Sequence, residues 1–138
     1  NDPGSKGASL WEKNNRGPWP IPPEICQFRR ASEWFKASLS PSDVVYLKLN
    51  CEGCECDIID DLLDSGEFDK VTFCVICFDV HKIDGMKHRK DETTQRLKPY
   101  PPPRFMDSKQ AMLGNTHYER IHSWLRLCRP KTLVSTTP

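Results

Sequence analysis

The sequence has 138 residues, of which 37% are hydrophobic and 28% are charged, and its formal net charge at pH 7 is +1. This length allows one domain, and a charge so close to zero excludes an argument for nucleic-acid or membrane-surface binding from bulk electrostatics. No apolar run approaches the roughly 20 residues of a membrane-spanning helix. We therefore predict no membrane span and no nucleic-acid partner.

The chain contains seven cysteines, an odd number, so at least one thiol has no partner within it. Five of them lie in the segment 51–77, in predicted strand or turn rather than at the spaced loop positions of a disulfide-rich scaffold. This distribution favours a reducing compartment, and we predict a cytoplasmic protein.

The amino-terminal part of the chain is predicted to be mostly irregular. Residues 1–23 are rich in glycine and proline and predict a loop. Residues 24–29 alternate in the manner of a short strand. Ser32 is a suitable N-cap for a helix over 33–38, and a turn at 41–43 leads to the next element.

The stretch 44–80 has the pattern of a strand, a helix and a second strand. Residues 44–49 are apolar except for Lys48, which suits a strand covered on both faces. From Cys54 to Asp64, apolar residues recur on one side of a helix that Ser65 and Gly66 would end. A second apolar run covers 71–80. The short connection predicts a βαβ unit with two parallel, neighbouring strands.

The pattern of apolar residues is lost after His81. Residues 82–115 have a basic bias and include the Pro-rich run 99–103, for which we expect extended chain. We predict one long basic, Pro-rich loop here, either solvated or used to bind an anionic substrate or a protein partner. A capping box at Thr116 and Glu119 then predicts a helix to about Cys128, and residues 132–136 could form a final strand.

Polar residues stand at the carboxyl ends of the two predicted strands, where open parallel sheets bind ligands. They are Asn50, Glu52 and Glu55 after the first strand and Asp79 and His81 after the second. An imidazole such as His81 can act as a base or a metal ligand. For Glu55, in the first turn of the predicted helix, the alternative is a structural role, because a carboxylate there stabilises the helix dipole and caps the helix.

The cysteines Cys51, Cys54 and Cys56, followed by Cys74 and Cys77, also suggest a zinc-binding module as a weaker alternative. Residues three apart in a strand point to opposite faces, so Cys74 and Cys77 could not both reach one ion if this run is extended. We favour small apolar packing residues and predict no metal.

The segment 48–59, KLNCEGCECDII, followed by LLDSG and a strand ending at His81, resembles the K-x-D-x-E-G-x-E-x-x-x-L segment of FkbM-type S-adenosylmethionine-dependent methyltransferases. The resemblance implies an α/β fold with a Rossmann-like class I methyltransferase sheet in three αβα layers. Residues 1–138 would be a single, incomplete domain that supplies the carboxyl-terminal half of this sheet. The implied reaction is O-methylation of a hydroxyl on a saccharide, lipid-linked or natural-product substrate, with S-adenosylmethionine as cofactor.

The resemblance also assigns roles to the candidate residues. His81, Asn50 and Glu52 would be catalytic, with Asn50, Cys51 and Glu52 contacting the cofactor, and Glu55 and Asp79 the substrate. Two departures favour an alternative, a catalytically inactive methyltransferase-like module that binds a protein partner through residues 82–115. The family's acidic residue is Asn50 here, and the glycine-rich loop of the cofactor-binding half is not among these residues.

Overall fold

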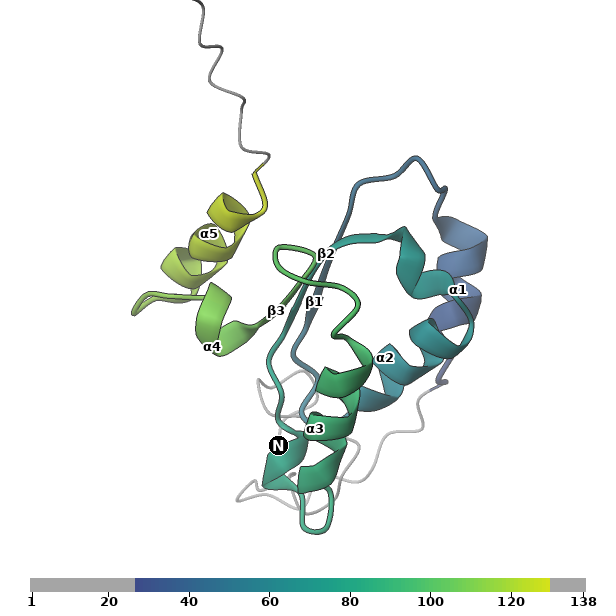
Figure 1. The fold of residues 1–138 in the computed structure, drawn as a ribbon, viewed down its shortest axis with the longest axis horizontal. Helices are drawn as coiled ribbons and strands as arrows, with labels where there is room; N and C mark the ends of the chain where they lie inside the picture. The colour runs from purple at the N-terminus through teal and green to yellow at the C-terminus, as the bar shows by residue number, and fades with distance from the viewer. Residues whose placement is uncertain (1–26, 130–138) are drawn as a thin grey trace, which may run out of the picture.

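A computed structural model describes residues 27–129 of the protein (Figure 1). Its centre is a sheet of three parallel strands in the order β1-β2-β3. The strands are β1 (Val45–Leu49), β2 (Val71–Ile76) and β3 (Phe105–Asp107). The predicted parallel pairing of the first two strands is confirmed, with Leu47 opposite Cys74 and Leu49 opposite Ile76.

The crossover between β1 and β2 is α2 (Glu55–Asp64), as the apolar periodicity predicts. Gly66 has a φ of 77°, which glycine adopts without strain, and leads into the short 3-10 helix η2 (Glu67–Lys70) before β2. The second strand is shorter than the predicted 71–80. Strand β2 ends at Ile76, opposite the last residue of β3, Asp107. After β2 the chain turns into another 3-10 helix, η3 (Val80–Lys82).

Helices cover both faces of the sheet (Figure 1). On one face lie α1 (Ala31–Ser38), α2 and α3 (Lys87–Arg96); on the other lie α4 (Ser108–Ala111) and α5 (His117–Leu127). The arrangement is a three-layer α/β fold, compatible with part of a Rossmann-like sheet.

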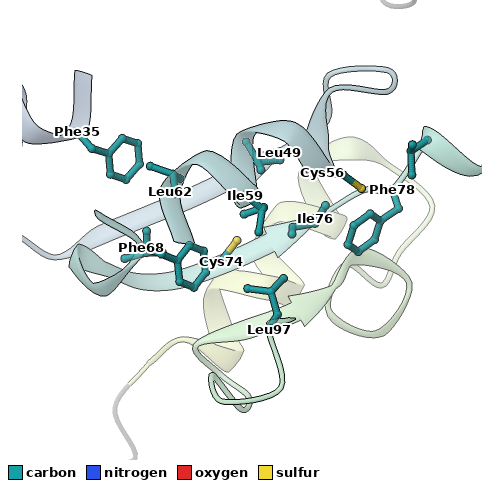
Figure 2. Close-up of a cluster of buried hydrophobic side chains, with 12 residues drawn as sticks. Phe35, Leu49, Cys56, Ile59, Leu62, Phe68, Cys74, Ile76, Phe78 and Leu97 are labelled. Carbon is teal, nitrogen blue, oxygen red and sulfur yellow. The ribbon is translucent and has the colours of Figure 1, made fainter. Parts of the chain in front are cut away.

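Each face has its own hydrophobic core, because alternate residues of a strand point to opposite sides. Cys74 and Ile76 pack under α2 with Ile59, Leu62 and other residues (Figure 2). Between them, Val75 points to the other face and packs with residues of β3, α4, α5 and the C-caps of these two helices, namely Met106, Ala111, Met112, Trp124 and Cys128. The apolar run of β2 therefore serves both cores.

The segment 82–115 is not one long loop, contrary to prediction, because it contains α3, β3 and α4. Helix α3 lacks an apolar stripe: Thr93 is its only buried residue. Ion pairs attach it to α2 instead. Arg89 lies 2.9 Å from a carboxylate oxygen of Asp60, and Arg96 lies 2.6 Å from the other.

The Pro-rich run 99–103 is folded into turns rather than extended. Arg104 anchors these turns, because its side chain donates hydrogen bonds to the carbonyls of Val71 (3.1 Å) and Asp69 (3.0 Å). Its guanidinium also lies over the ring of Tyr100, 4.6 Å from the centroid. These contacts direct the chain into β3.

The ends of the described region differ in how well the sequence predicts them. The capping box of Thr116 and Glu119 is present, and α5 confirms the predicted late helix. Residues 27–29 of the predicted strand 24–29 lie in no strand. The predictions for residues 1–26 and 132–136 lie outside the described residues.

Helix α1 begins at Ala31, so Ser32 lies in its first turn and does not cap it. The carboxylate of Asp61 on α2 takes over this function, since it accepts a hydrogen bond from the backbone N–H of Ser32 at 2.8 Å and one from Arg30 Nε at 2.8 Å. Burial alone would raise the pKa of Asp61, but these hydrogen bonds outweigh it and lower the pKa.

We expect Asp61→Ala to lower the free energy of unfolding by about 1 kcal/mol at pH 7, because α1 loses its N-terminal acceptor. Since the folded-state pKa is lowered, this stabilisation is present above the unfolded value of about 3.9 and is lost as the pH falls through the folded-state pKa. Urea unfolding of the wild type and the variant at pH 7 and at pH 3 would measure it. The exposed Asp91→Ala is the control, and a difference that grew in acid would contradict this account.

Candidate functional site

The carboxyl ends of β1 and β2 meet at one edge of the sheet and bring most of the predicted site residues together. Asn50 follows β1 directly and is exposed. Residues 51–54 turn the chain into α2, while Asp79 follows β2 and precedes η3. Asp79 lies close enough to Cys51, and Glu52 to Lys82, for their charges to interact. His81 lies within η3 and is exposed.

Glu55 organises the turn between β1 and α2. Its side chain is fully buried, and its carboxylate accepts hydrogen bonds from the backbone N–H groups of Cys51 (3.2 Å) and Gly53 (3.1 and 3.2 Å). Both central residues of the turn have positive φ angles, 55° at Glu52 and 121° at Gly53. Glu55 thus provides hydrogen-bond acceptors for backbone N–H groups that this unusual turn conformation would otherwise leave without a partner in the protein. Its contact with a substrate stays a prediction.

A lysine absent from the sequence-based list belongs to this edge. Lys82 forms an ion pair with Asp79, whose side chain is only 13% exposed. The hydrogen bond to Asp79 raises the pKa of Lys82, and the charges of Asp79, Glu52 and Glu55 add to this effect. The i,i+3 spacing of Asp79 and Lys82 could have indicated the pair, had a helical turn been predicted there.

The same edge strongly disfavours a thiolate. Burial, the charge of Glu55 and the neighbouring Cys54 raise the pKa of Cys51 to about 12. The Cys54 thiol also has a raised pKa, through burial and then the charges of Glu55 and Asp57. Burial and the neighbouring carboxylates therefore keep both thiols protonated at neutral pH.

The third strand contributes Asp107, which the sequence does not single out because β3 is too short to predict. One oxygen of Asp107 caps α4 by accepting from the backbone N–H of Lys109 at 2.9 Å. The other lies 3.0 Å from Lys90 Nζ, and that ammonium group is 5.2 Å from the centroid of the Phe78 ring. Carboxylates thus lie at or just beyond the carboxyl ends of two neighbouring strands, each paired with a lysine.

The cysteines that suggest zinc are distributed over the fold. Cys74 is fully buried in the core beneath α2, whereas Cys77 packs against the core on the opposite face. Within residues 27–129, no group of three or more His, Cys, Asp or Glu side chains is arranged to hold a metal ion. In the same part of the chain, no helix has both the length and the apolar character needed to cross a bilayer.

A groove of about 660 Å³ lies at the opposite end of the sheet. It is open and mainly apolar, and Val44, Tyr46, Phe73 and Leu127 are among its lining residues. Val44 and Tyr46 are 65% and 47% exposed, so β1 leaves apolar surface uncovered here. This groove is separate from the predicted residues at the carboxyl ends of the strands.

Comparison with protein-family models, with curated proteins and with solved structures finds no significant match to this chain.

The turn gives a direct test of the role of Glu55. We expect Glu55→Ala to lower the free energy of unfolding by about 2 kcal/mol, since it leaves the buried N–H group of Gly53 and the partly buried N–H group of Cys51 without this acceptor. Glu55→Gln retains one acceptor oxygen and should cost less. Denaturant unfolding measures both effects, and amide NMR shifts at residues 51 and 53 localise them.

The matched control is Asp57→Ala, which removes a 62% exposed carboxylate from the same helical turn. It should change the stability by no more than about 0.5 kcal/mol. Equal losses from both alanine variants would show that Glu55 has no special role in the turn.

Proposed function

We propose that this protein is an S-adenosylmethionine-dependent methyltransferase of the FkbM type, acting on a hydroxyl of a saccharide, lipid-linked or natural-product substrate. The observation that carries the proposal is the parallel β1–α2–β2 unit with a Glu-Gly-x-Glu turn at the carboxyl end of β1. The turn gives a physical reason for the pattern: Gly53 adopts a φ of 121°, and Glu55 accepts the N–H groups of the turn.

The chemistry of the site suits the cationic part of this cofactor. When bound, S-adenosylmethionine supplies an electrophilic methyl group on a positively charged sulfonium. The carboxylates of Glu52, Glu55 and Asp79 create a negative potential at the edge, and the raised pKa of the Cys51 thiol reflects burial together with the charges of Glu55 and Asp79. Asn50, Cys51 and Glu52 would hold the cofactor.

The remaining residues divide into substrate and proton-transfer roles. His81 is exposed on η3 at the same edge and would take the proton of the acceptor hydroxyl. Asp79 would orient the substrate with Lys82 as its ion-pair partner. A cytoplasmic location belongs to this proposal, since all six cysteines within residues 27–129 are free thiols.

The outer edge of β1 supports a role as one half of a larger sheet. No strand within residues 27–129 pairs with this edge. Leu49 O accepts from Cys77 N, and Val45 N donates to Thr72 Oγ1, so these residues face β2. The backbone groups of Tyr46 and Lys48 between them face outward. We propose that strands carrying the rest of the cofactor site pair here.

Asn50 favours a second candidate, a catalytically inactive methyltransferase-like module. An amide at the strand end cannot carry the negative charge that a carboxylate would supply there. Such a module would bind a protein partner through residues 82–115, where α3 presents Lys87 and His88 at its exposed start.

Calorimetric titration with S-adenosylmethionine separates the two candidates. The enzyme candidate predicts saturable binding with a dissociation constant between micromolar and millimolar. Asn50→Ala and Glu52→Gln should each weaken binding about tenfold, the effect of losing one hydrogen bond to a charged group. No heat at millimolar ligand would contradict the enzyme candidate for this chain, because it would show that these residues do not hold the cofactor by themselves.

Glu92→Gln is the matched control for Glu52→Gln. It makes the same change of charge at a 58% exposed carboxylate on α3, away from the candidate site. An equal loss of affinity in both variants would point to net charge rather than to a contact with Glu52.

A further inference from the structure

We propose that Cys51 and Cys54 form a dithiol–disulfide pair that exchanges with small-molecule disulfides of the glutathione class. The two residues occupy the first and last positions of the turn that joins β1 to α2. A Cys-x-x-Cys pair between a strand and a helix is the arrangement used by thiol–disulfide exchange proteins. This inference does not depend on the proposed function.

The backbone places the two residues within reach of each other. The central residues, Glu52 and Gly53, both have positive φ, as in the tight type I′ turn. In a β-turn the first and fourth α-carbons lie within about 7 Å. Residues joined by a disulfide have α-carbons roughly 4.4 to 6.8 Å apart. Against the larger effect of burial, the backbone N–H of Cys54 lowers the pKa of the Cys51 thiol slightly, which places the Cys51 sulfur close to Cys54.

Accessibility distinguishes this pair from the other thiols. Cys51 and Cys54 are both partly exposed, whereas Cys56, Cys74 and Cys128 are buried. Cys77 is partly exposed but packs against the core on the face of α4 and α5. Among the described cysteines, only Cys51 and Cys54 combine access to solvent with a partner in the same turn.

The exchange takes place in two steps. The thiolate of one cysteine attacks a sulfur of the small disulfide, which forms a mixed disulfide and releases one small thiolate that takes up a proton. The second cysteine then loses its proton and attacks the protein sulfur of the mixed disulfide. This step forms the Cys51–Cys54 bond and releases the second small thiol. The protein loses two electrons and two protons, and the small disulfide gains them as two thiols.

The surroundings of the pair affect the rate and the equilibrium of this exchange. Burial and the negative charges at this edge raise the pKa of both thiols, so few thiolates are present at pH 7 and exchange becomes faster as the pH rises. Strongly oxidising disulfides owe their potential to a stabilised thiolate in the reduced form. This pair lacks that stabilisation, and its disulfide should resist reduction.

The test is incubation of the folded chain with millimolar oxidised glutathione at about pH 8.5, where thiol exchange is efficient. Trypsin digestion then yields the peptide 49–70, which contains Cys51, Cys54 and Cys56. We expect this peptide to lose the mass of two hydrogens, and fragmentation to place the ring between residues 51 and 54. The ring should form roughly 30-fold more slowly at pH 7, because well below the pKa of a thiol its thiolate fraction falls tenfold per pH unit.

Three variants assign the bond. Cys56→Ser and Cys77→Ser should retain the loss of two hydrogens. Cys54→Ser should abolish it and leave Cys51 as a mixed disulfide with glutathione; serine is also a good N-cap for α2, so this variant should fold. Circular dichroism confirms folding.

Three results would overturn the proposal. The first is a ring that includes Cys56, and the second is mixed disulfides on both Cys51 and Cys54 without a ring. The third is a ring that forms only after the chain is denatured in urea.

Discussion

The rest of this structure depends on the hydrogen bonds that the buried carboxylate of Glu55 accepts in the turn after β1. A carboxyl group without solvent contact is tolerated only when hydrogen bonds replace its hydration, and here the N–H groups of Cys51 and Gly53 provide them. In return, Glu55 fixes a turn with two positive φ angles at the end of β1. That turn sets where α2 begins and which side chains stand at the edge of the sheet. The candidate cofactor contacts and the cysteine pair both follow from its conformation.

The acidic face of α2 illustrates how one helix organises its neighbours. Asp60 binds the arginines of α3, and Asp61 supplies the N-terminal acceptor of α1. From sequence alone these carboxylates indicate a solvated face, because their partners are about 30 or more positions away. In the structure they connect three helices on one side of the sheet. Individual surface ion pairs contribute little to the free energy of unfolding, but a network that shares its carboxylates also fixes how α1 and α3 are oriented against α2.

Where hydrophobic periodicity is strong, the sequence predicts the fold well. The apolar runs of β1, α2 and β2 identify the parallel unit, and the capping box of Thr116 and Glu119 identifies α5. Helix α3 has no such signal, because one buried threonine and a set of arginines replace the apolar stripe. The candidate site follows the same division. Asn50, Glu52 and Asp79 can be placed from the strand ends, whereas Lys82 and Asp107 depend on a 3-10 helix and a three-residue strand that no local pattern shows.

The outward-facing backbone of β1 has a consequence for the behaviour of the isolated chain in solution. Within residues 27–129 no strand pairs with this edge, and such an edge next to exposed apolar side chains such as Val44 and Tyr46 can template pairing with foreign strands, which is how aggregation often begins. Lys48 interrupts the apolar run near the carboxyl end of β1, and an edge lysine opposes such growth because a second copy would place like charges near each other. The same side chain that breaks the pattern of a buried strand thus disfavours pairing of this edge with a second copy of the chain.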